Sequence, residues 1–422
     1  MVVGGGARMV NGPRDRMVGL TAYPGKPMPT RHDAHVLIIG GGATGGGLAH
    51  DLALRGLRVT VVDRGELTSG TSGRHHGLLH SGARYAVGDR EAGVECIQEN
   101  MILKRIAPGT FECNDGLFVA VCDEDLEYLE PLVEGCTGAG IPMQRLTAVE
   151  ALRLEPNLNP EVKVAVRVPD ATVDPMRLIL RFFATARHNG AEIRPYMEVI
   201  GLDRHGGRVT GATVRDHVTG KIGEIHADLV VNSAGPWSGK VAAMAGASVP
   251  ITPSPGVLLA LRGRYSNMVI NRMHKSGDGD IVVPQRGLSI IGTTSWVVDD
   301  PDDLSVPEDH VERMYAEGSK LIPALRNAPR RAAWSAARPL VGSAGAATGR
   351  ELSRTFQTFD HSEQDGIEGF VTITGGKATT LRGMAELCAD VVCRKLGIDE
   401  PCRTRDTVLL PHTAYYSAAA AA

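Results

Sequence analysis

Residues 35–63, HVLIIGGGATGGGLAHDLALRGLRVTVVD, constrain the fold more than any other stretch of this chain. Residues 36–39 form a short apolar run, which is typical of a buried parallel strand. Gly40, Gly42 and Gly45 follow with the spacing G-x-G-x-x-G. That spacing allows a tight turn, a close approach of a pyrophosphate to the backbone, and close packing of the next helix on the strand.

The residues after the glycines complete the pattern. A helix start there offers free N–H groups and the positive end of its dipole to phosphates. Residues 57–62 are the predicted second strand, which ends on Asp63, where a carboxylate can accept hydrogen bonds from ribose hydroxyls. The unit predicts a dinucleotide-binding strand–helix–strand. Because the chain holds 51 glycines, a glycine-rich loop without a ligand is the alternative.

The bulk composition sets the class of protein. A length of 422 residues predicts more than one structural unit, and 43% hydrophobic residues are typical of a globular protein. The net charge of −3 gives no support for nucleic-acid binding. Seven scattered cysteines without a C-x-x-C pair indicate reduced thiols in a cytoplasmic protein and no metal site. No apolar run approaches the roughly 20 residues that span a bilayer.

Periodicity and turn residues predict the remaining elements. Asp174 followed by Pro175 is a helix start, and the helix should run to about His188. The other predicted helices are 89–107, 124–139, 146–154, 307–322 and a last one to about Leu396. The predicted strands are 116–122, 191–195, 197–203, 208–216, 221–226, 227–234, 256–262, 267–272, 280–284 and 288–292. The last four alternate like an antiparallel sheet that covers the cofactor.

Eight motifs occur in order between residues 40 and 382: GGGATGGG, ALRGLRVTVVDR, GTSGRHHGLLHSGARYAV, VDPMRL, VNSAGPW, IIGTTS, ARPLV and ITGGKATTLR. Together they resemble the FAD-dependent glycerol-3-phosphate dehydrogenases, over roughly residues 34–411. HGLLHSGARYAV and CRKLG at 393–397 most resemble the large catalytic subunit of the anaerobic bacterial enzyme. That subunit usually continues into a cysteine-rich module implicated in an iron–sulfur cluster, which these residues do not contain. Pro255 and Leu381 also depart from the lysine and tyrosine that the family tends to have.

The resemblance implies an α/β fold, with a FAD-binding Rossmann-like domain of the glutathione-reductase/D-amino-acid-oxidase type and an antiparallel-sheet substrate (cap) domain. We expect the FAD-binding domain at 34–110, 170–250 and 350–411, and the cap at 111–169 and 251–349. Residues 1–33 are expected to be a disordered extension and 412–422 a tail. FAD suits the chain better than NAD because the cofactor-facing segments are spread over its whole length, which favours a tightly held cofactor.

The implied reaction is oxidation of sn-glycerol 3-phosphate to dihydroxyacetone phosphate, with hydride transfer from C2 to flavin N5. Electrons would pass to a quinone or to partner subunits. The expected location is cytoplasmic, with peripheral association at the cytoplasmic face of the inner membrane as a further option. Two rival hypotheses remain: a flavin oxidase of a 2-hydroxy acid, amino acid or amine, and a non-catalytic flavoprotein subunit.

The predicted site residues follow from this chemistry. Lys377 follows a Gly-Gly turn at a helix start, where a cation would stabilise the reduced flavin. A phosphate favours arginine, because its planar fork binds two oxygens. The predicted catalytic residues are Lys377, Arg338 and His80, and the predicted substrate ligands are Arg338, Arg382, Arg84 and Tyr85. His80 or His76 could take the hydroxyl proton, or either could be a structural hydrogen-bond partner of the flavin. The predicted cofactor residues are Gly40, Gly42, Ala43, Thr44, Gly45, Asp63, Arg64, Thr71, Ser72, His76, Val199, Ala234, Gly235, Trp237, Gly376, Lys377 and Thr379.

Overall fold

The computed structural model describes residues 30–342 and 355–417. Most of the predicted extension at 1–33 and the end of the predicted tail at 412–422 lie outside the described residues. In the part of the chain that is described, no helix is both long and apolar enough to cross a membrane.

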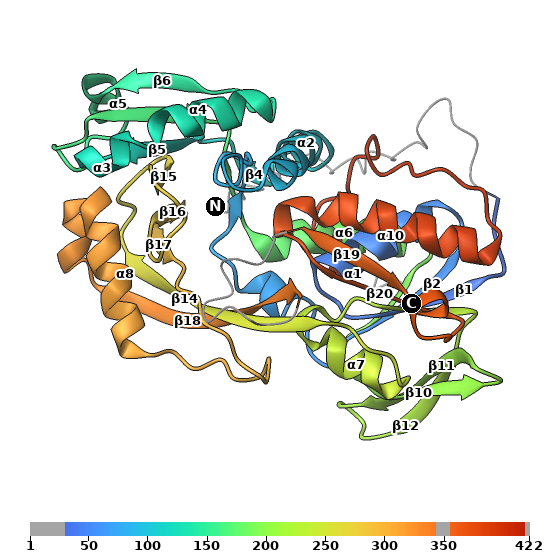
Figure 1. The fold of residues 1–422 in the computed structure, drawn as a ribbon. Coiled ribbons are helices and arrows are strands. Elements are labelled where there is room, and N and C mark those ends of the chain that lie inside the picture. Colours follow the sequence, from blue (N-terminus) through green and yellow to red (C-terminus); the bar gives the residue numbers. More distant parts are fainter. Residues whose placement is uncertain (1–29, 343–354, 418–422) are drawn as a thin grey trace, which may run out of the picture.

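A six-stranded sheet carries the glycine-rich turn (Figure 1). In spatial order its strands are β19 (Phe356–Asp360), β20 (Phe370–Gly375), β13 (Leu229–Asn232), β1 (His35–Ile39), β2 (Arg58–Val62) and β9 (Glu192–Arg194). All neighbours are parallel except β19, which pairs with β20 in the antiparallel sense. The strand–helix–strand unit predicted at 35–63 is therefore confirmed.

Both faces of this sheet are covered, which explains its unbroken apolar strands. Val36 and Ile38 pack in one core with α1 (Ala43–Leu54), α6 (Pro175–His188) and α10 (Leu381–Leu396). Leu37 and Ile39 point to the opposite face and pack in a core with α7 (Ser238–Met244) and a small three-stranded sheet. That small sheet is β10 (Met197–His205), β11 (Arg208–Asp216) and β12 (Ile222–His226). Asp174 caps α6 through the backbone N–H of Arg177, as predicted.

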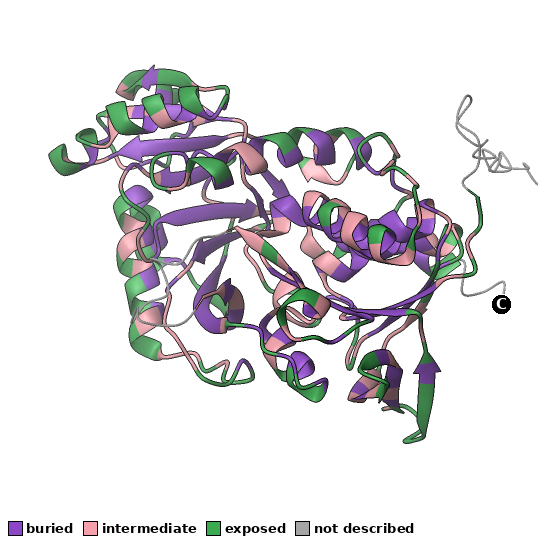
Figure 2. Ribbon diagram, turned by 45° about the vertical axis from the view of Figure 1, so that its right-hand side comes forward, coloured by how far each residue is buried: buried purple, intermediate pink, exposed green. Residues whose placement is uncertain are grey.

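An eight-stranded sheet forms the second part of the molecule (Figure 1). In spatial order its strands are β18 (Arg330–Val341), β14 (Ile251–Arg262), β17 (Leu288–Gly292), β16 (Ile281–Gln285), β15 (Val269–Arg272), β5 (Gly116–Ala120), β7 (Val164–Val168) and β6 (Gln144–Thr147). All neighbours are antiparallel except the pair β15 and β5. The strands of both large sheets are predominantly buried, whereas the helices that flank them alternate between buried and exposed residues (Figure 2).

The remaining helices are divided between the two parts of the molecule. They are α2 (Arg90–Ile106), α3 (Asp123–Leu126), α4 (Leu129–Gly138), α5 (Ala148–Leu154), α8 (Glu308–Leu321), α9 (His361–Gln364) and α11 (Ala414–Ser417). A third small sheet holds β3 (Leu78–Leu79), β8 (Ala171–Val173) and β4 (Phe111–Glu112). The two-part division fits the predicted FAD-binding and cap segments, and we retain those domain bounds as a proposal.

Several local predictions differ from the structure, and the strands β6, β7 and β19 were not predicted. The helix predicted at 124–139 is two helices, because Asp125 turns inward, accepts the N–H of Val121 and pairs with Arg272. The helix predicted at 146–154 begins at Ala148, since Thr147 and Glu150 form a capping box there. β18 was not predicted, because its pairing with β14 is long-range and its sequence, RRAAWSAARPLV, has no clear alternation.

Candidate active site

A cavity of about 630 Å³ lies where the two parts meet. Its wall comes from segments far apart in the chain: the β1–α1 turn, residues 62–85, the β13–α7 connection, β18, and the turn after β20. In the six-stranded sheet, the strands β1, β13 and β20 all present their carboxyl ends to it. Ligands of open α/β sheets bind at this edge.

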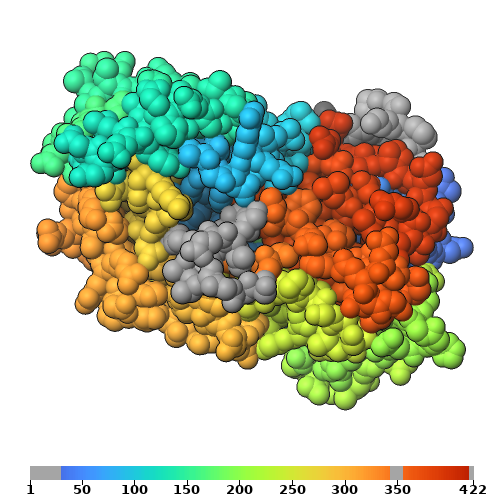
Figure 3. Space-filling model, in the orientation of Figure 1, coloured from blue at the N-terminus to red at the C-terminus, as the bar shows by residue number. Residues whose placement is uncertain are grey.

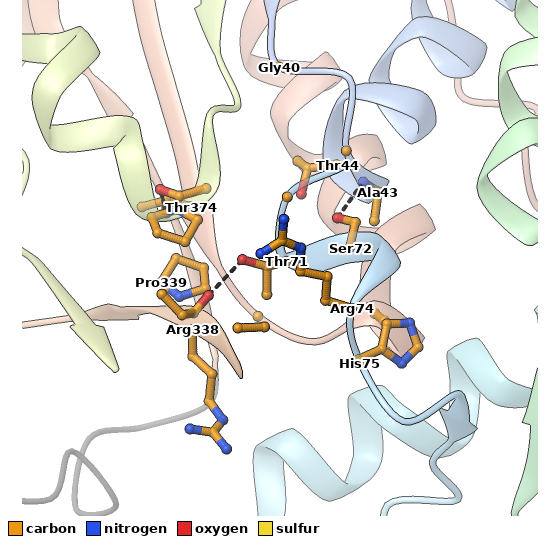
Figure 4. Close-up of a pocket in the computed structure, with 18 of the residues that line it drawn as sticks. Gly40, Ala43, Thr44, Thr71, Ser72, Arg74, His75, Arg338, Pro339 and Thr374 are labelled. Carbon is orange, nitrogen blue, oxygen red and sulfur yellow. Dashed lines mark hydrogen bonds between the residues drawn. The ribbon is translucent and has the colours of Figure 1, made fainter. Parts of the chain in front are cut away.

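The glycine-rich turn forms one end of the cavity. Gly40 has a positive φ of +114°, and a Cβ at Gly45 would collide with the carbonyl oxygen of Gly40. No side chain caps α1 at Gly42, and the first turn of α1 has no acidic residue. The Ser72 hydroxyl accepts the N–H of Ala43 at 2.9 Å (Figure 4). An open helix N-terminus without a competing carboxylate fits a pyrophosphate.

Asp63 lies beside this turn and shapes it. Its two carboxylate oxygens accept the N–H groups of Gly41 at 2.6 Å and of Gly65 at 2.8 Å. Burial raises the pKa of Asp63, although these two hydrogen bonds act in the opposite direction. A carboxylate oxygen can accept more than one hydrogen bond, so Asp63 retains acceptor capacity on the cavity side.

Three histidines line another part of the wall. The Nδ1 atoms of His75 and His76 accept the backbone N–H groups of Gly77 and Leu78, at 3.0 and 3.2 Å. In the neutral rings the proton is therefore on Nε2, and these two histidines act as donors toward a ligand. Burial lowers the pKa of His80 to about 3, so its ring is also neutral near pH 7.

Three cationic side chains converge on these histidines. Burial lowers the pKa of His76, and the positive charges of Arg84 and Arg338 lower it further. The charges of Arg84 and Lys377 act on His80 in the same way, after burial. This wall of the cavity therefore combines positive charge with neutral imidazoles.

Strand pairing places Arg338. It lies opposite Ser254 in the β14–β18 pair, and its guanidinium donates to the carbonyl oxygens of Ser254 at 3.2 Å and of Thr294 at 3.0 Å, and to the Thr293 hydroxyl. A Cβ at Gly256 would lie 2.5 Å from Nη2 of Arg338. The guanidinium points away from the glycine-rich turn (Figure 4). It is therefore directed toward the end of the cavity opposite the predicted pyrophosphate site.

Arg84, from the segment between β3 and α2, lines the cavity, and its side chain contacts the connection between β15 and β16. Nη2 donates to Asp280 at 2.5 Å and to the Ser276 hydroxyl at 2.9 Å, and the positive charge holds the pKa of the Asp280 carboxyl well below its usual range. Nη1 of Arg84 is buried and has no hydrogen-bond partner within the described residues. A buried guanidinium N–H group without a partner is costly, and an anionic ligand in the cavity would satisfy it.

Lys377 lies in the turn between β20 and η4 (Ala378–Thr380). Its Nζ is 3.8 Å from a carboxylate oxygen of Glu95 and 5.0 Å from the centre of the Tyr85 ring. Glu95 belongs to α2. In Figure 3 the light-blue surface of the segment that holds α2 lies beside the red surface of the C-terminal segment that holds α10. The charge of Lys377 is thus fixed at the junction of the two parts.

The structure gathers almost all of the predicted site residues around this cavity. The exceptions are Gly45 and Arg382. Gly45 is buried where α1 packs on the turn. Arg382 is 1% exposed, and its guanidinium pairs with Glu99 at 2.5 Å and with Glu386 at 2.7 Å. Its charge is balanced inside the protein, so the prediction that Arg382 binds the substrate phosphate is wrong.

Other lining residues were not predicted. They include Arg74, His75, Met197, Glu198, Lys240, Ser276, Gly277, Thr293, Asp302, Leu304, Thr374 and Ala378. Most lie on connections that local sequence does not single out. Five of them had a signal, because they stand in the motifs quoted from the sequence: Arg74, His75, Thr293, Thr374 and Ala378.

Comparison with known proteins agrees with this geometry. Residues 35–391 match the family described as DAO, FAD dependent oxidoreductase. The chain therefore belongs to the FAD-dependent oxidoreductases of this family. Within that class it is similar to a subunit of the anaerobic glycerol-3-phosphate dehydrogenase of Escherichia coli strain K12, with 46% identity over 90% of this chain and 71% of the relative.

Solved structures extend the comparison. The glycerol-3-phosphate dehydrogenase of Bacillus halodurans, solved with FAD, gives a TM-score of 0.68 with 26% identity, covering 89% of this chain and 68% of that one. The glycine oxidase of Geobacillus kaustophilus gives 0.70 with 22% identity, over 89% of this chain and 99% of that one. The second likeness shows the fold alone. The predicted fold class is confirmed.

Proposed function

We propose that this protein binds FAD and oxidises sn-glycerol 3-phosphate to dihydroxyacetone phosphate. The observation that carries the proposal is that Arg84, Arg338 and Lys377 line the same cavity as His76 and His80, and that Nη1 of Arg84 is buried there without a partner among the described residues. Fixed cations suit a phosphate, and a neutral imidazole suits removal of a hydroxyl proton. The 46% identity to one component of a glycerol-3-phosphate dehydrogenase supports the same substrate.

The residues at the other end of the cavity fit FAD. The open start of α1 and the Gly40–Gly42 turn would hold the pyrophosphate, and Asp63 the ribose. Bound FAD would supply the hydride acceptor of the reaction. Gly235, Trp237 and Thr379 border the same cavity from the turns that follow β13 and β20.

We assign the substrate residues as follows. Arg338 and Arg84 hold the phosphate, with Arg84 taking the place that the sequence had given to Arg382. We assign His80 as the acceptor of the C2 hydroxyl proton, because its ring lines the cavity and its backbone N–H is fixed by the Thr379 hydroxyl at 3.1 Å. His76, whose Nδ1 already accepts a backbone N–H, is a donor and not the base. Lys377 stabilises negative charge that develops during the reaction.

The electron acceptor is proposed on separate grounds from the substrate. The E. coli relative is named as one subunit of its enzyme, which supports electron transfer to a partner subunit, and a quinone is the alternative acceptor. We propose a cytoplasmic location with peripheral membrane association. Each of these requires its own test with partner proteins and vesicles.

A substrate panel tests the proposed function. Anaerobic enzyme should lose its visible flavin colour with glycerol 3-phosphate. It should not lose it with glycerol, which lacks the phosphate, or with alanine, sarcosine or 2-hydroxyglutarate. Reduction by one of the last three alone would assign the protein to another oxidase class, and reduction by none would favour a non-catalytic flavoprotein.

Arg338→Lys should retain FAD and weaken glycerol 3-phosphate binding by about ten- to a hundredfold, since a bidentate charge-assisted contact is worth roughly 1.5–3 kcal/mol. The half-saturating substrate concentration for flavin reduction measures this. Arg330→Lys is the matched control, because Arg330 lies on the same strand but pairs with Glu308 at the exposed surface. An equal loss of substrate binding in both variants would show that the Arg338 substitution acts by disturbing β18 and not by removing a phosphate contact.

Lys377→Met should slow the limiting rate of flavin reduction more than it raises the half-saturating substrate concentration. An interaction made only in the transition state lowers the chemical rate, whereas a ground-state contact alters binding. Anaerobic stopped-flow reduction across substrate concentrations separates the two quantities. Lys320→Met, at an exposed pair with Glu317, is the control. An unchanged limiting rate with weaker binding would make Lys377 a phosphate ligand instead.

A further inference from the structure

Two carboxylates from the connection between β17 and α8 reach across to the part that carries the glycine-rich turn. Asp302 pairs with Arg64 at 2.8 Å and accepts the indole N–H of Trp237 at 2.9 Å. Lys240 of α7 pairs with Asp300 at 2.8 Å and with Asp302 at 3.3 Å. We call Asp300 and Asp302 the acidic clasp.

The partners of the clasp are themselves organised. The Arg64 guanidinium stacks over the Trp237 ring at 4.6 Å, and the Trp237 ring rests on the backbone at Gly70. Asp302 is also fixed from its own side, because its N–H donates to Asp300 at 2.9 Å. Burial opposes the charged form of Asp302, yet hydrogen bonds from Arg64 and Trp237 lower its pKa, so the carboxylate is ionised at neutral pH.

The clasp lies at one particular end of the cavity. Asp302, Arg64, Trp237 and Lys240 all line it. Arg64 directly follows Asp63, the residue assigned to the ribose, and the apolar residues nearby in the lining include Val199 and Met244. This places the clasp beside the adenosine half of the predicted cofactor.

We propose that the acidic clasp closes the cavity over the adenosine end of FAD and sets the rate at which FAD leaves. The inference rests on the proposed function, because it takes FAD as the bound cofactor. Opening requires the β17–α8 connection to separate from Arg64, Trp237 and Lys240. The charged partners are about half exposed, between 45% and 59%. Salt should therefore weaken the clasp.

The test measures FAD release directly, by the rate at which an excess of a second apoflavoprotein takes up the FAD that leaves the holoprotein. Asp302→Asn should release FAD roughly three- to tenfold faster than wild type at low salt, the range expected for loss of a few exposed charge contacts. Raising the salt should accelerate wild-type release toward the mutant rate and change the mutant little. Trp237 fluorescence should change in the same variant, because its indole N–H exchanges a charged acceptor for a neutral one.

Glu130→Gln is the matched control, since Glu130 pairs with Arg145 on the exposed surface of the cap and does not line the cavity. It should release FAD at the wild-type rate. Asp300→Asn weakens one exposed contact, to Lys240, and should increase the FAD release rate less than Asp302→Asn does. It provides a second test of the clasp if Asp302→Asn does not fold. If Asp302→Asn and wild type release FAD at the same rate, and salt changes neither rate, the clasp does not control FAD release. That result would leave FAD binding itself intact. A folded wild-type protein that holds no FAD would overturn the proposed function and the clasp together.

Discussion

Gly42→Val should give a folded protein that retains no FAD. Gly42 precedes α1 at the open helix start, and a Cβ there would lie 2.9 Å from the Ser72 hydroxyl, which accepts the N–H of Ala43. A branched side chain would displace that hydroxyl and fill the place of the pyrophosphate. The FAD content after gel filtration, with circular dichroism to verify the fold, measures the loss.

The control for this substitution is Gly223→Val. Gly223 lies on β12, where a Cβ would meet no atom within 4 Å, and strands tolerate valine well. Its FAD content should equal that of wild type. A folded Gly42→Val protein with full FAD content would show that the turn does not hold the pyrophosphate.

Arg382→Met should destabilise the protein by about 3–5 kcal/mol, because removal of one partner of a buried ion pair leaves the other charge uncompensated. The side chains of Glu99 and Glu386 would lose their guanidinium, and Glu99 is only 7% exposed. The free energy of unfolding in denaturant measures the effect.

A second variant separates a lost buried charge from a lost surface charge. Arg405→Met removes another partner of Glu386, but Arg405 is 55% exposed, so the cost should stay below about 1 kcal/mol. Arg382→Met protein of normal stability that bound glycerol 3-phosphate poorly would restore Arg382 as a substrate ligand and contradict the assignment made from the structure.

The parts of the fold that could be predicted are those set by short-range rules. The 35–63 unit and the start of α6 depend on glycine spacing, strand patterning and a local cap, and the structure has them where the sequence predicted them. β18 depends on β14, which is far away in sequence, so its own residues carried little signal. Local sequence patterns carry little information about pairing between strands that are far apart in the chain.

The same distinction explains the site. Arg338 and Lys377 were identified from their neighbours, and both line the cavity. Arg382 stands five residues after Lys377 in the same motif, yet it lies in the first turn of α10 and faces the buried Glu99. Which side of a helix start a residue faces depends on the packing of α2. Asp302 gave no local signal, because its partners, Arg64, Trp237 and Lys240, are distant in sequence.

The most direct test of the account is one anaerobic titration of the FAD-loaded protein with glycerol 3-phosphate. We predict that about one equivalent bleaches the visible flavin band and yields an equal amount of dihydroxyacetone phosphate. A band that persists in excess glycerol 3-phosphate, with no dihydroxyacetone phosphate formed, would contradict the central claim that this cavity oxidises that substrate.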